Sequence, residues 1–183
     1  MTESEQLILL KTARETIRAR VYGDAPQYDE PTEPLLQPRP LFVTLRCGGR
    51  LRGCIGTLQP AGPLFEAVKD FAVSSAFNDP RFPPFEKNEM TDLSIEISVL
   101  SPLEKVTSLD SVEIGKHGLY AKRGARSGVL LPQVPVEQRW NRAQFLKHTC
   151  LKAGLPEDAW KTGEVDFYSF TAEVFSEDEG GIA

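Results

Sequence analysis

The sequence predicts an α+β fold, in which short strands joined mostly by hairpins are interrupted by separate helices. Residues 93–100 alternate between apolar and polar side chains, which is typical of a half-buried strand. Residues 5–22 instead repeat apolar side chains at helical spacing. The strands do not alternate regularly with helices along the chain, so we do not expect a doubly wound α/β sheet.

The first forty residues are predicted to form an amphipathic helix followed by an irregular connector. The helix covers residues 5–22 and ends at Gly23. The connector covers residues 24–40, and its prolines exclude a regular helix and predict an extended path over the surface. These prolines are Pro26, Pro31, Pro34, Pro38 and Pro40.

A hairpin is predicted next, with strands at residues 41–45 and 51–57 and a turn that contains Gly48 and Gly49. In this hairpin Cys47 lies opposite the residues nearest the turn, whereas Cys54 lies farther along the returning strand. The two cysteines are therefore not cross-strand neighbours, which argues against a disulfide between them.

Pro63 is well suited to the first turn of a helix, which we expect to end near Asn78. The Pro- and Phe-rich loop 79–85 is interpreted as a lid on the core, with the wall of a pocket as the alternative. In the strand at residues 93–100, Glu96 belongs to the polar set of side chains. It is either a solvent-facing or ion-paired residue or part of a functional site.

The second half of the chain is predicted to contain another hairpin, with arms at residues 114–120 and 128–131. Asn141 is a suitable N-cap for a helix, with Gln144 three residues later and Gly154 at the end. A final strand is expected from residue 165 to residue 175, followed by a disordered polar tail at residues 176–183.

Composition limits the classes of function. The chain of 183 residues is 40% hydrophobic, which suffices for the core of one domain. It has no apolar run of about 20 residues that could span a membrane, and its acidic start is unlike a signal peptide. We therefore expect a soluble, cytoplasmic protein with no membrane partner. The net charge of −5 argues against general nucleic-acid binding, although residues 111–152 carry eight basic and only two acidic side chains.

Residues 51–57 (LRGCIGT) place one thiol between two glycines with an arginine close by. Gly53 and Gly56 have no Cβ, so a substrate or partner can approach the backbone on both sides of Cys54. On a regular strand Arg52 and Cys54 share a face, and a guanidinium in that position would lower the thiol pKa. The alternative is that Cys54 is a small buried apolar residue.

Several segments, in this order and spacing, resemble the AMMECR-type domain family: residues 51–57, 79–82, 95–102, 117–119 and 127–133. The resemblance extends from about residue 41 to residue 175. It implies one compact α+β domain over residues 1–183, with two unequal lobes and the segment containing Cys54 near the cleft between them. It implies no settled activity, but it suggests a functional link to radical-SAM and Memo-type proteins. The family pattern has an aspartate where this chain has Asn141.

The first functional hypothesis is a cleft enzyme. Cys54 would be the nucleophile or redox thiol, Arg52 would stabilise its thiolate, and His117 would act as general acid or base. Glu96 would orient the histidine or bind substrate. His148 is more simply interpreted as a surface residue. The sequence has neither Cys-x-x-Cys nor His-x-x-x-His, so its spacing predicts no metal site, and it identifies no cofactor.

The second hypothesis is a non-catalytic binding module for an anionic ligand, a nucleic acid or a partner protein. The backbone at Gly53 and Gly56 would then allow close approach, and the thiol would be incidental. The basic residues available for an anionic ligand are Arg52, Arg81, Lys122, Arg123 and Arg126. Whether Cys54 is a reactive thiolate or an unreactive thiol distinguishes the two hypotheses.

Overall fold

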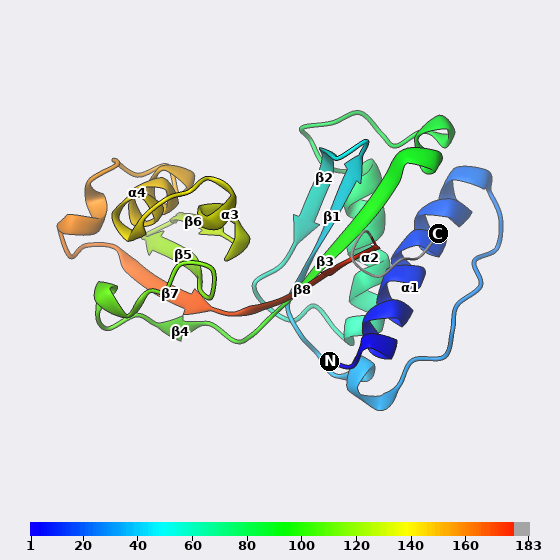
Figure 1. Cartoon of the computed structure of the whole chain (residues 1–183), viewed down its shortest axis with the longest axis horizontal. Helices are drawn as coiled ribbons and strands as arrows, with labels where there is room; N and C mark the ends of the chain where they lie inside the picture. The colour runs from blue at the N-terminus through cyan, green and yellow to red at the C-terminus, as the bar shows by residue number, and fades with distance from the viewer. Residues whose placement is uncertain (178–183) are drawn as a thin grey trace. The chain divides into compact units, whose positions relative to one another are not determined.

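The computed structural model describes residues 1–177 of the chain. The chain divides into two compact units, each with its own antiparallel sheet (Figure 1). Unit 1 contains residues 1–100 together with the segment that begins at Glu173, and unit 2 contains residues 101–172. The predicted α+β class is confirmed. No helix within residues 1–177 is long and apolar enough to cross a membrane.

Unit 1 is a four-stranded sheet with two helices packed on one face (Figure 1). Its strands in spatial order are β2 (Arg50–Gly56), β1 (Leu41–Cys47), β3 (Leu93–Leu100) and β8 (Ala172–Ser176). Its helices are α1 (Glu3–Tyr22), α2 (Leu64–Phe77) and the short 3-10 helices η1 (Glu33–Leu36) and η2 (Lys87–Asp92). The predicted first hairpin, both long helices and the alternating strand are all present.

The core of unit 1 follows directly from the two periodicities in its sequence. Val43 on β1 and Ile97 on β3 are register partners, and both are fully buried among the side chains that the two helices contribute. The alternate residues of these strands, among them Thr44 and Glu96, therefore belong to the opposite, polar face. Helix α1 ends where Gly23 adopts a left-handed conformation with φ of 75°.

Two connecting segments contribute to this core. The connector 24–40 is mostly irregular, as predicted, but it contains η1, whose Leu35 is fully buried. The expectation of a purely surface path is therefore wrong, because a proline at the start of η1 permits one short helical turn. In the loop 79–85, Phe85 is buried in the core, in agreement with the interpretation of this loop as a lid.

Unit 2 is built around a second four-stranded sheet (Figure 1). Its strands in spatial order are β4 (Glu104–Lys105), β7 (Asp166–Phe170), β5 (Gly118–Arg123) and β6 (Arg126–Leu130). Its helices are η3 (Leu109–Ser111), α3 (Gln133–Glu137), α4 (Arg142–Lys152) and η4 (Ala159–Lys161). The second hairpin is present, and Asn141 and Gln144 form the predicted capping box of α4. Phe145 on α4 is fully buried in the core of this unit.

The single strand expected at residues 165–175 is in fact two strands in two different sheets. Strand β7 pairs with β5 in unit 2, whereas β8 belongs to the sheet of unit 1. Thr171 separates the two strands. No glycine or proline marks this division, so the local pattern alone is that of one continuous strand.

The predicted disordered tail begins too early. Ser176 is the last residue of β8, and Glu177 is only 6% exposed. The Glu177 carboxylate accepts hydrogen bonds from Arg14 Nε at 2.6 Å, from Arg14 Nη2 at 2.7 Å and from the Ile95 backbone N–H at 2.8 Å. The prediction is therefore wrong for these two residues, and the rest of the predicted tail lies outside the described residues.

We predict that Glu177→Gln lowers the free energy of unfolding by about 2 kcal/mol, because it removes the charge from a buried group with charge-assisted hydrogen bonds. Urea denaturation measures the change. Glu164→Gln is the matched control, because this carboxylate is 68% exposed and lies 3.3 Å from Arg123. The control is expected to cost less than about 1 kcal/mol. Equal losses in the two variants would contradict the importance of the buried contact.

Candidate functional site

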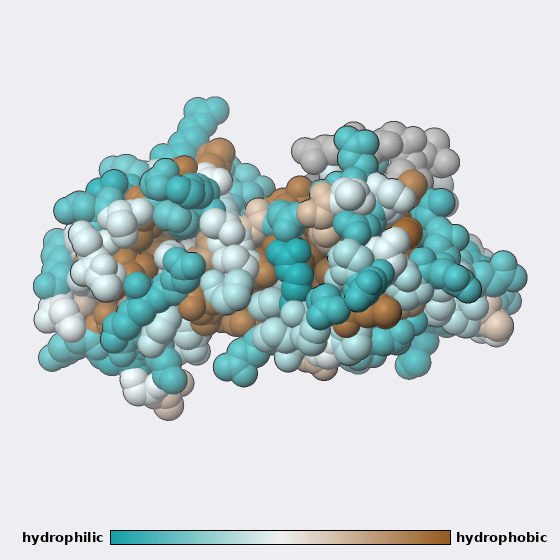
Figure 2. Space-filling view, turned by 90° about the horizontal axis from the view of Figure 1, so that it is seen from below, coloured by the Kyte–Doolittle hydropathy of each residue, from teal (hydrophilic) through white to brown (hydrophobic). Residues whose placement is uncertain are grey.

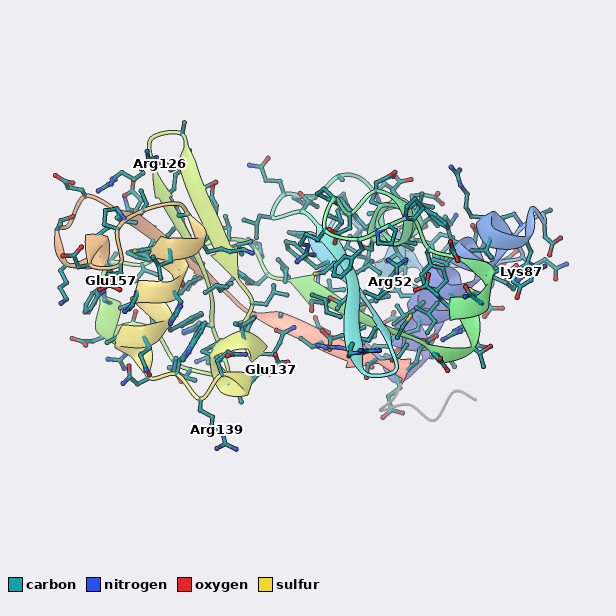
Figure 3. The ribbon with its side chains drawn as sticks, turned by 90° about the horizontal axis from the view of Figure 1, so that it is seen from above. Arg52, Lys87, Arg126, Glu137, Arg139 and Glu157 are labelled. Atoms are coloured by element: carbon teal, nitrogen blue, oxygen red, sulfur yellow. The ribbon has the colours of Figure 1, made fainter. Side chains whose placement is uncertain are left out.

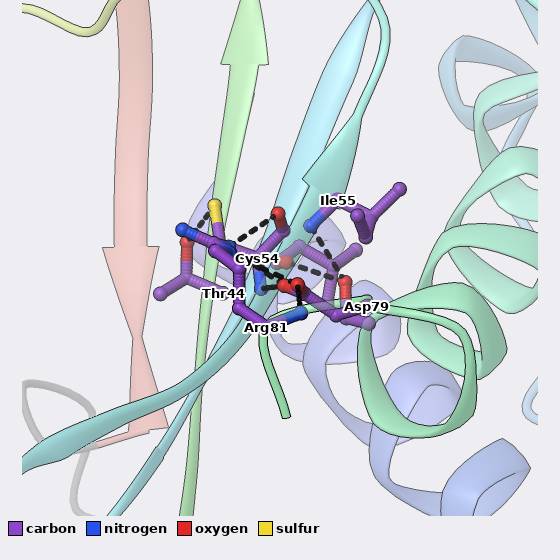
Figure 4. Close-up of polar contacts among 7 residues, drawn as sticks. Thr44, Cys54, Ile55, Asp79 and Arg81 are labelled. Carbon is purple, nitrogen blue, oxygen red and sulfur yellow. Dashed lines mark hydrogen bonds and ion pairs between the residues drawn. The ribbon is translucent and has the colours of Figure 1, made fainter. Parts of the chain in front are cut away.

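Two of the sequence-predicted site residues, Cys54 and Glu96, lie in one row across the polar face of the unit 1 sheet. Thr44 on β1 is the register partner of Cys54 on β2 and of Glu96 on β3. Neighbouring strands are about 4.8 Å apart, so two strand spacings separate the backbones of Cys54 and Glu96. The Thr44 hydroxyl donates a hydrogen bond to Cys54 Sγ at 3.3 Å (Figure 4). Sequence reasoning missed Thr44, although its position on the predicted hairpin was available.

Arg52 does not have the role predicted for it. In the pairing of β1 with β2, Leu45 faces Gly53 and Arg46 faces Leu51, so a β-bulge leaves Arg52 without a register partner. The bulge breaks the alternation of faces on which the prediction depended. The Arg52 guanidinium instead forms a bidentate ion pair with Glu89, at 2.6 Å and 2.9 Å.

Two aromatic rings complete the surroundings of Arg52, which is almost fully buried (Figure 3 shows its position). Its guanidinium carbon lies 5.9 Å from the centroid of the Phe82 ring and 5.4 Å from that of Phe85. The hydrogen bonds from Arg52 hold the pKa of the Glu89 carboxyl below its usual value. Arg52 therefore fastens the loop after α2 to the hairpin, and its charge is compensated by Glu89.

The cation that does reach Cys54 is Arg81, which together with Asp79 binds the Cys54 backbone (Figure 4). Asp79 is 4% exposed, and its Oδ2 accepts the Cys54 backbone N–H at 2.9 Å. Arg81 donates to both carboxylate oxygens of Asp79, at 2.6 Å and 2.9 Å, and its Nη2 donates to the Cys54 carbonyl oxygen at 3.2 Å. The ion pair with Arg81 holds the pKa of Asp79 far below its usual value.

Sequence reasoning named Arg81 as a ligand-binding residue but missed Asp79. The available signal was the Asp-Pro-Arg sequence directly after a predicted helix, because an aspartate in a turn readily binds nearby backbone N–H groups.

The environment of Cys54 disfavours the thiolate form of its side chain. Burial raises the pKa of Cys54 and is the largest effect. The Thr44 hydrogen bond and the Arg81 charge lower the pKa, whereas the carboxylates of Asp79 and Glu96 raise it. The net direction is upward, so the predicted lowering of the thiol pKa is wrong.

The two glycines beside Cys54 are required by the chain itself. A Cβ at Gly53 would clash with the carbonyl oxygen of Ser75 on α2. A Cβ at Gly56 would clash with the Leu41 carbonyl oxygen and with the ring of Phe42. These glycines therefore permit close packing within unit 1, instead of the approach of a substrate that was expected from the sequence.

His117 belongs to unit 2, where it closes a turn before β5. Its Nδ1 accepts the Glu113 backbone N–H at 3.1 Å, and its own backbone N–H donates to the Glu113 carbonyl oxygen at 3.0 Å. Any proton transfer by this side chain would therefore have to use Nε2. His148 is half-buried and stacks on Trp140, with ring centroids 3.9 Å apart, so it is a partly exposed residue that packs against a neighbouring ring.

All three cysteines are free, and the predicted absence of a bond between Cys47 and Cys54 is confirmed. Cys47 faces Arg50 beside the turn, whereas Cys54 faces Thr44. Within residues 1–177, no three His, Cys, Asp or Glu side chains are grouped closely enough to hold a metal ion.

We predict that Gly53→Ala lowers the free energy of unfolding by about 3 kcal/mol, because its methyl group would force α2 away from the hairpin. Gly124→Ala is the control. A methyl group at Gly124 would meet no atom of the described residues within 4 Å beyond its chain neighbours, and the φ of 61° alone should cost about 1 kcal/mol. Chemical denaturation compares the two variants, and an equal or smaller loss for Gly53→Ala would contradict the packing argument.

Comparison with known proteins supports the resemblance found in the sequence. The AMMECR1 family model matches residues 10–175. Protein MK0488 of Methanopyrus kandleri is 44% identical over 98% of this chain and 91% of its own length. The crystal structure of the uncharacterized protein PH0010 from Pyrococcus horikoshii is similar with a TM-score of 0.86 and 38% identity, covering 97% of this chain and 93% of that one. This chain therefore belongs to the AMMECR1 family.

Proposed function

We propose that the polar face around Cys54 binds a small polar molecule that is neutral or positively charged, with Cys54 as a protonated thiol. The observation that carries this proposal is the set of groups next to the thiol. The carboxylates of Asp79 and Glu96 raise the pKa of the thiol. Arg81 lowers this pKa and is itself paired with Asp79.

The row of Cys54, Thr44 and Glu96 offers a thiol, a hydroxyl and a carboxylate on one surface. Thr44 is only 5% exposed, and the other two side chains are half-buried. A row of this kind can recognise a ligand through hydrogen bonds, because a thiol and a hydroxyl both donate and accept, and a carboxylate accepts.

An anionic ligand is less favoured, because four of the five basic residues expected to bind it are engaged within their own unit. In unit 1, Arg52 is paired with Glu89 and Arg81 with Asp79. In unit 2, Arg123 is bonded to Glu164, and Arg126 donates to the Gly154 carbonyl oxygen. An anion would have to displace carboxylates from both arginines of unit 1, at a cost in stability.

Thiol catalysis is the second candidate. The register places Glu96 in the same row as Cys54, and the Thr44 hydroxyl contacts Sγ directly. In this alternative the thiol would pass its proton toward Glu96 as an electrophilic substrate is attacked. The two candidates differ in the state of the thiol. A catalytic thiolate requires a low pKa of Cys54, whereas a thiol that only contacts a ligand does not.

The titration of Cys54 separates the two candidates. We predict that the rate of alkylation of Cys54 by iodoacetamide rises with pH with a midpoint above the usual thiol value of about 8.5, because burial disfavours the thiolate. The measurement uses a Cys47→Ala variant, and mass spectrometry distinguishes modification at Cys54 from modification at the fully buried Cys150. A midpoint well below 8.5 would support catalysis by a thiolate and reject our proposal.

The preference for a neutral ligand is tested with two probes of the same size, neutral iodoacetamide and anionic iodoacetate. We predict that Cys54 discriminates against iodoacetate more strongly than free cysteine does, by about threefold or more, because the nearby carboxylates repel it. Glu96→Gln should reduce this discrimination, whereas Glu164→Gln in unit 2 should leave it unchanged. Preferential reaction with iodoacetate would indicate an anion site instead.

A further inference from the structure

The edge strand β2 is held at Ile55 and at Cys54 by side chains from α2 and the loop that follows it. Among the strands that the structure describes, β2 has β1 on one side and none on the other. The Ser75 hydroxyl, which is fully buried, accepts the Ile55 N–H at 2.9 Å and donates to the Val43 carbonyl oxygen at 2.8 Å. Because Val43 and Ile55 are register partners, this hydroxyl bridges two residues of the ladder.

The backbone of Cys54 is held by charged groups. The Cys54 N–H donates to Asp79, and the Cys54 carbonyl oxygen accepts from Arg81. The Arg81 backbone N–H also donates to Asp79 Oδ1, at 3.1 Å, so the loop after α2 is closed on itself. Both polar groups of the Cys54 backbone are thus satisfied by one ion pair, which restricts the direction in which the thiol points.

We propose that Asp79 and Arg81 are positioning residues that hold the backbone of Cys54 in place and favour opposite charge states of its thiol. This inference rests on the proposed function, because it assigns the ion pair to the site that Cys54 forms. Asp79 and Arg81 are brought to Cys54 by α2 and the loop that follows, not by the strand that carries the thiol.

The sign of each effect follows from the charges that face Cys54. Arg81 stabilises the thiolate, whereas Asp79 and Glu96 destabilise it, and the Thr44 hydroxyl donates to Sγ. Removing the cation should raise the thiol pKa, and removing the adjacent anion should lower it. A purely structural role predicts a different pattern. Loosening the loop with either substitution would admit water to Sγ and lower the pKa in both cases.

The experiment measures the pH midpoint of iodoacetamide alkylation at Cys54 in the Cys47→Ala background. We expect Arg81→Gln to raise the midpoint and Asp79→Asn to lower it, each by about half a pH unit or more, a roughly threefold or greater change in rate at a fixed pH below the midpoint. Arg81→Lys retains the charge, so its midpoint should stay near that of the parent protein. Asp110→Asn and Arg142→Gln break an ion pair of 2.9 Å in unit 2 and should leave the midpoint unchanged.

Downward shifts in both variants, or no shift in either, would overturn the proposal. Arg81 is 48% exposed at its side chain, so Arg81→Gln should fold even if the buried Asp79→Asn variant does not. In that case the midpoints of Arg81→Gln and Arg81→Lys suffice to test the proposal, because only the first variant should raise the midpoint. Failure of the proposed function would be seen in the parent protein instead, as a low midpoint of alkylation or as preferential reaction with iodoacetate.

Discussion

The close approach of α2 to the first hairpin is the constraint on which the candidate site depends. Gly53 leaves no room for a side chain against the Ser75 carbonyl oxygen, and the Ser75 hydroxyl is inserted between residues of β1 and β2. This contact sets the position of the end of α2, and therefore of the loop that carries Asp79 and Arg81. Gly53, the glycine next to the thiol, is therefore needed for the packing of α2 against the hairpin, and the space beside it is occupied by α2.

The arginines of this region are used in a consistent way. Arg52 and Arg81 each form a two-point ion pair with a carboxylate from the segment after α2, namely Glu89 and Asp79. Such pairs define geometry because the planar guanidinium matches the carboxylate at two atoms. They also compensate the positive charge, so the surroundings of Cys54 differ from the electropositive site expected around a reactive thiolate. Burial is the main reason for favouring a protonated thiol, and this electrostatic balance favours a neutral or cationic ligand.

Much of the fold could be predicted because its signals are local. Alternation alone predicts the strand at residues 93–100 with the same limits that the structure shows, and the Asn141–Gln144 cap identifies the start of α4. The polar face of β3 follows from the same alternation, which correctly places Glu96 away from the core. The division between β7 and β8 was missed, because two strands in line have the same local pattern as one strand and only their partners distinguish them.

Local sequence patterns are sufficient to predict the hairpin that carries Cys54, its separation from Cys47 and the position of Glu96 on a polar face, because periodicity and turn residues act over a few positions. Which charged groups reach the thiol depends instead on contacts between distant parts of the chain. A β-bulge of one residue redirected Arg52 to Glu89, and the packing of α2 brought Asp79 and Arg81 to Cys54 across 25 and 27 positions of the chain. Register and helix packing depend on contacts between distant segments, and no local pattern encodes them.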